Sequence, residues 1–297
     1  GAALAALALA LLAPSGLHPG FVPFNFGDLF SYHAPMRHLG AAGLQEGRLP
    51  FWNPYIFAGL PLAANSQLGL FYPLSALSWM FPLSLALSCD CLFHWIWGAF
   101  GVAALARSQR LNAAASWTLG AAYLLSPMVF YRIVEGIPTL LASLSWIPWC
   151  WLFWSMGRRG WLAACFALQF LSGHPQFLIV NALGMAVYSA IRREYNGLRD
   201  LAVAGGFALA LAAIQWVPTY GFISKSVRTH WPKAYALGYS MPPSAMWTWL
   251  SPNALGNPFD GSYQGPASMF FESGAMHLGI VVLALAVWGW RSSRSRW

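Results

Sequence analysis

The chain has 297 residues, of which 58% are hydrophobic and only 8% are charged, whereas soluble globular proteins have about 25% charged residues. So few charges leave too little polar surface for a soluble protein of this length, and a disordered chain needs the opposite bias. With no internal repeat and only 4 cysteines, collagen-like, coiled-coil and disulfide-framework proteins are excluded as well. The composition therefore predicts a membrane protein.

The formal net charge is +8, from 16 basic and 8 acidic residues. The basic residues flank apolar runs, whereas a nucleic-acid-binding protein gathers them on one face, so we expect no nucleic-acid partner. The cysteines lie in or beside apolar runs, and the close pair Cys89 and Cys91 lacks the second pair of ligands that a zinc site needs. We expect the cysteines to be buried packing residues.

Eight apolar segments are candidate membrane-spanning helices, each of which needs about 20 residues. They are 1–13, 88–106, 113–131, 137–156, 160–173, 176–191, 200–218 and 274–290. The first is short and begins at Gly1, so we interpret the chain as an N-terminal fragment of a longer protein. A cleaved signal peptide is the alternative, but no basic segment precedes the apolar run.

The basic residues also predict the orientation of these spans. Short loops after the even-numbered spans contain Arg107, Arg110, Arg158, Arg159, Arg192, Arg193, Arg199, Arg291, Arg294 and Arg296. Such loops lie in the cytoplasm, so the long segments 14–87 and 219–273 are expected on the outer side. The segment 71–87 is apolar, but Pro73 and Pro82 interrupt it and a further span would invert the later loops. We expect a re-entrant or interfacial hairpin there.

An amphipathic stretch in the first outer loop, residues 29–46, predicts a helix that lies along the membrane interface. Its apolar positions are Leu29, Met36, Leu39 and Leu44, and its polar positions are Tyr32, His33, Arg37, His38 and Gln45.

Asp28 stands between the first span and this amphipathic helix. A carboxylate at this point is suited to accept a proton from an acceptor hydroxyl or to hold a divalent metal near a phosphate. The alternative is a helix N-cap, a role worth about 1 kcal/mol. The two roles are compatible.

Three further acids are second-rank candidates. Glu135 is expected to form a surface ion pair with the nearby Arg132. Glu272, at the end of the last outer loop, has no partner that the sequence identifies. Asp90 lies near the outer end of the second span, where an acidic side chain must face protein or water.

Several motifs occur in a fixed order along the chain. They are Gly27-Asp28, Leu49-Pro50-x-Trp52-Asn53-Pro54, Gly59-x-Pro61-x-x-Ala64-Asn65-x-Gln67, Phe71-Tyr72-Pro73 and Gly173-His174-Pro175-Gln176. This order resembles the bacterial YfhO-like membrane proteins, which belong to the GT-C superfamily of glycosyltransferases. The resemblance is dense from about Phe26 to Leu178 and weaker to Trp290, and family members are considerably longer.

The resemblance implies an all-α polytopic membrane protein, with residues 1–297 forming one GT-C-like bundle of about eight transmembrane helices and long first and last outer loops. It implies a multi-pass protein of the bacterial inner membrane that transfers a sugar from a polyprenyl-phosphate donor at the outer face. The other expected partners are membrane lipid and a glycan or lipid-linked acceptor. Asp28 matches the family's acidic residue after the first span. The paired acid of many members is missing, so Mg²⁺ or Mn²⁺ at Asp28 and metal-free base catalysis both stay open.

The same resemblance suggests candidate substrate-binding residues. Arg37, Arg48 and His174 are candidates for the departing lipid phosphate, Asn65 and Gln67 for sugar hydroxyls, and Trp52 for stacking on a sugar ring. Each has a structural alternative: lipid headgroups for the arginines, helix capping for His174, the interfacial aromatic belt for Trp52, and turn formation for Asn65.

Two other functions compete with sugar transfer. A transporter or flippase of lipid-linked glycans is expected to carry charges in the middle of its spans and to break helices at matching positions of two repeats. The spans here are nearly free of charge in the middle, and no repeat is visible. A non-catalytic role in assembling the cell envelope is the third hypothesis.

Overall fold

The computed structural model describes residues 27–238, 240–257, 260–266, 269–270, 272–277 and 280–294. The predicted first span, 1–13, lies outside these residues. The described chain is mainly helical, with one two-stranded sheet, as the composition predicts. It divides into two compact units: the described residues up to Leu124 with Ile133–Thr229, and Leu125–Arg132 with the described part of the chain after Thr229.

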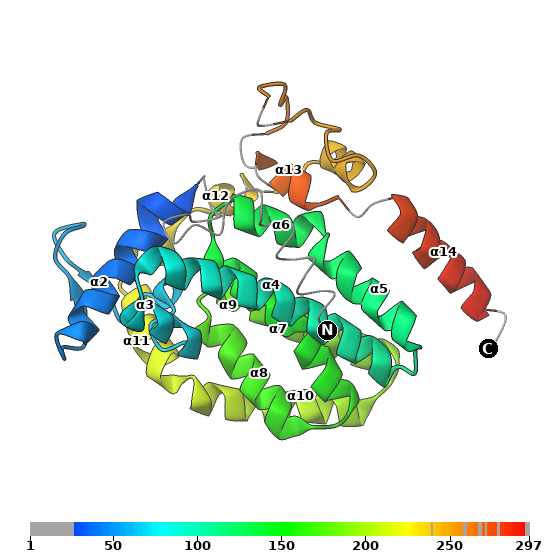
Figure 1. Cartoon of the computed structure of the whole chain (residues 1–297), viewed down its shortest axis with the longest axis horizontal. Coiled ribbons are helices and arrows are strands. Elements are labelled where there is room, and N and C mark those ends of the chain that lie inside the picture. The colour runs from blue at the N-terminus through cyan, green and yellow to red at the C-terminus, as the bar shows by residue number, and fades with distance from the viewer. Residues whose placement is uncertain are drawn as a thin grey trace. The chain divides into compact units, whose positions relative to one another are not determined.

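The first unit is a helical bundle. Its longer helices are α4 (Leu83–Ser108), α5 (Ala113–Leu124), α7 (Pro138–Ser155), α8 (Arg159–Leu171), α9 (Pro175–Ile191), α10 (Tyr195–Leu211) and α11 (Ala213–Ile223). Helix α4 packs most extensively on α7 and α5, and α8 packs on α10 and α7 (Figure 1). Helix α7 is apolar on every side, and most of its residues are buried. It therefore supplies much of the core, including Trp146, Cys150 and Trp154.

Among the described helices, α4 alone is long and apolar enough by itself to cross a membrane. The number of such spans rises to three if α5 with α6 (Pro127–Val134), and α10 with α11, each form one bent span. Helices α8 and α9 are apolar but shorter. The structure thus has a membrane-helix signal, while the prediction of about eight spans is not confirmed.

The segment before α4 begins with the π-helical turn η2 (Leu29–His33) and continues as α2 (Ala34–Gln45). A helix over this segment was predicted, and His38 and Gln45 of its predicted polar face are exposed. The prediction was wrong for His33 and Arg37, which are buried together with Leu29 and Met36. Arg37 faces inward because its acidic partner, Asp90, lies on α4.

Proline residues divide the rest of this segment as expected. Strands β1 (Trp52–Asn53) and β2 (Leu60–Pro61) form an antiparallel hairpin, followed by η3 (Ser66–Leu68), η4 (Pro73–Ala76) and α3 (Leu77–Met80). Pro73 begins η4, and Pro82 directly precedes α4. Helix α4 therefore starts at Leu83, earlier than the predicted span 88–106.

The remaining elements follow α11. They are η5 (Val227–His230), α12 (Lys233–Leu237), η6 (Pro243–Trp249), α13 (Glu272–Ala275) and α14 (Ile280–Arg294). Helix α14 overlaps the predicted last span, 274–290.

Candidate functional site

Asp28 is exposed and does not cap its helix. It occupies the N-cap position of η2, but its side chain makes no capping hydrogen bond. The preceding Gly27 has φ of +74°, and a Cβ at this position would lie 2.1 Å from the Glu135 carbonyl oxygen. Only glycine fits there, and the contact places Asp28 beside the turn at Glu135. The alternative role of Asp28 as a helix N-cap is therefore wrong.

A buried ion pair joins α2 to α4. The Nη1 atom of Arg37 donates to Oδ2 of Asp90 at 2.8 Å, and the two side chains are only 4% and 2% exposed. Asp90 faces protein, as a charged residue in an apolar helix must. Arg37 is therefore enclosed in the bundle and does not reach lipid headgroups.

The pair continues into a chain of hydrogen bonds that ends on α7. Nδ1 of His94 lies 2.7 Å from the Asp90 carbonyl oxygen and 3.0 Å from Asp90 Oδ1, so Nδ1 carries a hydrogen. Nε2 of His94 lies 2.6 Å from the Tyr72 hydroxyl, to which Trp146 donates at 3.0 Å. Each polar hydrogen of His94, Tyr72 and Trp146 has an acceptor if the Tyr72 hydroxyl donates to Nε2 of His94. Burial raises the pKa of Tyr72 above its ordinary range, which keeps the phenol protonated.

His33 lies beside this network on the same helical segment and is 3% exposed. Its pKa is lowered to about 3, mainly by burial and also by the nearby Arg37 and His174, while a hydrogen bond to the Gln67 backbone opposes the shift. His33 is therefore neutral at physiological pH. Its burial was not predictable from the pattern, because a polar residue on an amphipathic helix is ordinarily exposed.

The turn between α8 and α9 carries His174. Its Nδ1 lies 2.9 Å from the Thr139 hydroxyl, and the ring is buried. His174 stands at the N-cap of α9 without a side-chain capping bond, so the helix-capping alternative is wrong. Gly173, with φ of +113°, leaves room for the Ser66 carbonyl oxygen, from which a Cβ would be 2.9 Å away.

Asn65 and Gln67 belong to the loop that this glycine accommodates. The Asn65 side chain accepts a hydrogen bond from the Gln67 backbone at 3.2 Å and donates to the Tyr32 hydroxyl at 2.6 Å. Asn65 is thus a turn former, and its amide nitrogen also ties the loop to η2. Tyr32 is four residues after Asp28, about one helical turn away, so the loop is anchored about one turn from Asp28.

Helix α11 holds the same loop from the other side. Gln215 donates to the Ala63 carbonyl at 3.1 Å and Thr219 donates to the Ala64 carbonyl at 2.8 Å. The bend of 81° between α10 and α11 brings these two side chains to the loop. The position of Asn65 therefore depends on α11.

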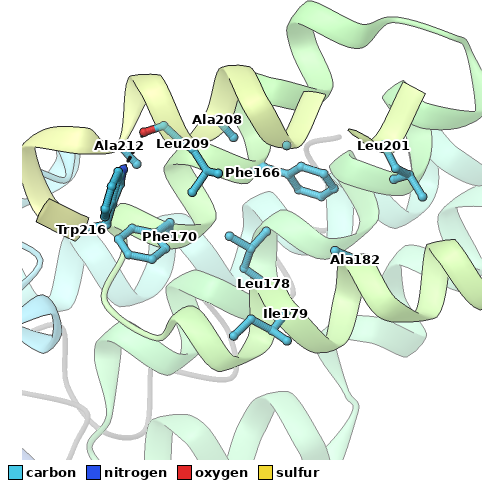
Figure 2. Close-up of a pocket in the computed structure, with 11 residues that line it drawn as sticks. Phe166, Phe170, Leu178, Ile179, Ala182, Leu201, Ala208, Leu209, Ala212 and Trp216 are labelled. Atoms are coloured by element: carbon cyan, nitrogen blue, oxygen red, sulfur yellow. Dashed lines mark hydrogen bonds between the residues drawn. The ribbon is translucent and has the colours of Figure 1, made fainter. Parts of the chain in front are cut away.

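An apolar groove of about 330 Å³ lies between α8, α9, α10 and the start of α11 (Figure 2). Its larger lining residues are Phe166, Phe170, Leu178, Ile179, Leu201 and Trp216. Phe170 and Trp216 are drawn at the same end of the groove in Figure 2. Phe170 precedes the His174 turn by four residues, and Trp216 follows Gln215. One end of the groove thus adjoins the polar loop.

Arg48 and Trp52 lie apart from this cluster, at the β1–β2 hairpin. Arg48 is 74% exposed and forms an ion pair with Glu46. Trp52 is 57% exposed, and its ring covers Gly59, where a Cβ would lie 2.2 Å from the indole. Both residues line a second, partly polar groove of about 450 Å³.

Two second-rank predictions need correction. In the second unit Arg132 is buried and forms two hydrogen bonds with Glu272, at 3.0 and 2.5 Å. Glu272 therefore has a partner that the sequence did not reveal. Glu135 is buried rather than at the surface.

Within the described residues, no three His, Cys, Asp or Glu side chains are grouped closely enough to hold a metal ion. Binding of Mg²⁺ or Mn²⁺ at Asp28 stays a prediction. The Asp28 carboxylate is the one protein ligand identified for it. In comparisons with known proteins, no family model matches the sequence, and no curated protein or solved structure is detectably similar.

Proposed function

We propose that the protein is a glycosyltransferase that takes a sugar from a polyprenyl-phosphate donor at the outer face of a bacterial inner membrane. The proposal includes a GT-C-like arrangement in which the apolar helices together form about eight spans. It rests on the motif resemblance and on one structural observation. That observation is an exposed carboxylate, Asp28, beside a polar loop that adjoins one end of an apolar groove.

This arrangement suits an amphiphilic substrate. A prenyl chain has only apolar surface, and burying each of its CH₂ groups contributes about 0.8 kcal/mol to binding. The aromatic and aliphatic side chains of the groove provide the surface against which it is buried. A sugar phosphate needs hydrogen-bond donors and acceptors. Asn65 and Gln67 supply these at the same end of the groove.

In the proposed reaction the acceptor hydroxyl attacks the anomeric carbon of the donor sugar while Asp28 accepts the hydroxyl proton. The bond from the anomeric carbon to the phosphate oxygen breaks, and the lipid phosphate leaves with the bonding electrons. Donors that are held in place before reaction stabilise the charge that develops on that oxygen. His174 is the proposed donor, whereas Arg37 has the role of positioning the outer loop and Arg48 lies apart, at the β1–β2 hairpin.

The experiment is sugar transfer in proteoliposomes, with radiolabelled polyprenyl-phosphate hexoses and pentoses as donors. Asp28→Asn is expected to lower the transfer rate at least about 100-fold, the usual contribution of a general base, with an unchanged thermal unfolding midpoint. Glu194→Gln, an acid on a predicted cytoplasmic loop, is the control and keeps full activity. Full activity of Asp28→Asn would refute the proposed role of this residue.

Transport of lipid-linked glycans is the second candidate, favoured by the sharp break between α10 and α11, since broken helices are common in transporters. A fluorescent polyprenyl-phosphate lipid that moves between leaflets of the same proteoliposomes would support it. If movement persists in Asp28→Asn while no sugar transfer occurs in the wild type, transport is the correct function.

A further inference from the structure

A small cavity lies between α2 and the η4–α3 segment, away from the apolar groove. Its polar lining is Arg37, Ser75 and Ser78, and its apolar lining is Gly40, Leu68, Leu70 and Trp79. The space open to the centre of a water molecule is about 10 Å³. This is about the volume of one water-sized sphere.

Three buried polar atoms in this lining have no hydrogen-bond partner among the described residues. They are Nε of Arg37 and the hydroxyl oxygens of Ser75 and Ser78. The side chains are buried, with exposed fractions of 5%, 4% and 5%. Buried polar groups in folded proteins are almost always paired, and three unpaired ones around one cavity indicate a shared ligand.

We propose that this cavity is a binding site for a single water molecule. The Nε–H group of Arg37 donates to the water oxygen, and the two water hydrogens are donated to the oxygens of Ser75 and Ser78. Three hydrogen bonds are the usual number for a buried water. An anion fits less well, because chloride is larger than water and Asp90 already balances the charge of Arg37 at 2.8 Å.

The water gives Arg37 a second structural role. Through Nη1 this side chain binds α4, and through Nε and the water it binds the segment that leads into α4. The site therefore joins α2 to two successive parts of the chain. It does not depend on the proposed sugar transfer.

The sign of the stability change on removing the hydroxyls tests the proposal. With the water present, Ser75→Ala and Ser78→Ala each remove a hydrogen bond and are expected to lower the thermal unfolding midpoint by roughly 2–4 °C. The double variant is expected to lower it by less than the sum of the two shifts, because one water serves both serines. Ser145→Ala is the control: this buried hydroxyl bonds to the carbonyl of Ala142 in its own helix, and no coupling with Ser75→Ala is expected.

Two results would overturn the water site. If the hydroxyls are truly unpaired, each alanine variant raises the midpoint, because it removes an unsatisfied buried group. A midpoint that rises with chloride at constant ionic strength would assign an anion in place of water. If a serine variant does not fold, an experimental density map of the wild type that resolves ordered waters decides the question by the presence or absence of density in the cavity.

Discussion

The buried His33 of η2 makes the stability of the protein depend on pH. His33 has an ordinary pKa of 6.5 and a folded pKa of about 3. Protons therefore bind the unfolded chain more readily than the folded one. The contribution of the neutral His33 to the free energy of unfolding is fully present above pH 6.5, and it declines as the pH falls from 6.5 toward 3.

The size of the effect follows from this difference. One pKa unit corresponds to about 1.36 kcal/mol, and pH 5 lies 1.5 units below the ordinary value of 6.5. His33 is therefore expected to cost about 2 kcal/mol of unfolding free energy between pH 7 and pH 5. For a large domain this lowers the thermal midpoint by roughly 4 °C or somewhat more.

The assay is thermal unfolding of the purified protein in detergent at pH 7 and pH 5, for the wild type and for His33→Gln. Glutamine keeps a donor for the Gln67 backbone but does not titrate. The variant is expected to lose less stability than the wild type on acidification, by about 2 kcal/mol. The matched control is His38→Gln, a substitution of an exposed histidine on α2, which is expected to retain the wild-type decline. Equal declines in His33→Gln and the wild type would refute the reasoning.

Three further substitutions test the contacts around this loop. Asp90→Ala leaves Arg37 buried without a counter-charge and is expected to cost about 3–5 kcal/mol in chemical denaturation, most of which Arg37→Met with Asp90→Leu restores; a double variant as unstable as Asp90→Ala would contradict this. Gly27→Ala is expected to destabilise the protein more than Gly47→Ala. Both variants place alanine at a positive φ, which costs about 1–2 kcal/mol, but only Gly27→Ala also brings a Cβ against a carbonyl oxygen. Equal midpoints would show that this contact relaxes. Gln215→Ala removes the donor to the Ala63 carbonyl and is expected to speed elastase cleavage of that loop and to lower the thermal midpoint by roughly 2–4 °C, whereas an unchanged cleavage rate would mean that α11 does not hold the loop.

Local patterns in the sequence predict much of the helical layout but not which way charged side chains face. The apolar runs place α4 and α7 correctly to within a few residues, and the prolines mark the breaks between η4, α3 and α4. The inward orientation of Arg37 was not predictable from its helix, because its partner Asp90 is 53 residues away. One signal was present: Asp90 and His94 are four residues apart in an apolar run, and a helix places them on one face.

The number of spans could not be predicted from composition for a related reason. An apolar side chain contributes the same hydropathy whether lipid or protein covers it. Helix α7 is apolar throughout and buried by its neighbours, whereas α8 and α9 are shorter than a full span. Likewise, the sequence identified Asp28 and Asn65 as candidates, but the contact of Asn65 with Tyr32 and the support from Gln215 required the tertiary structure.

The ion pair between α2 and α4 has a consequence for how the chain is assembled during synthesis. The ribosome makes Arg37 well before Asp90, so α2 emerges as a helix whose inward-facing cation has no counterpart until α4 has been made. Docking of α2 must therefore wait for the synthesis of α4. A substitution at Asp90 in α4 would consequently cause a defect in the packing of the preceding segment, before any later helix is made.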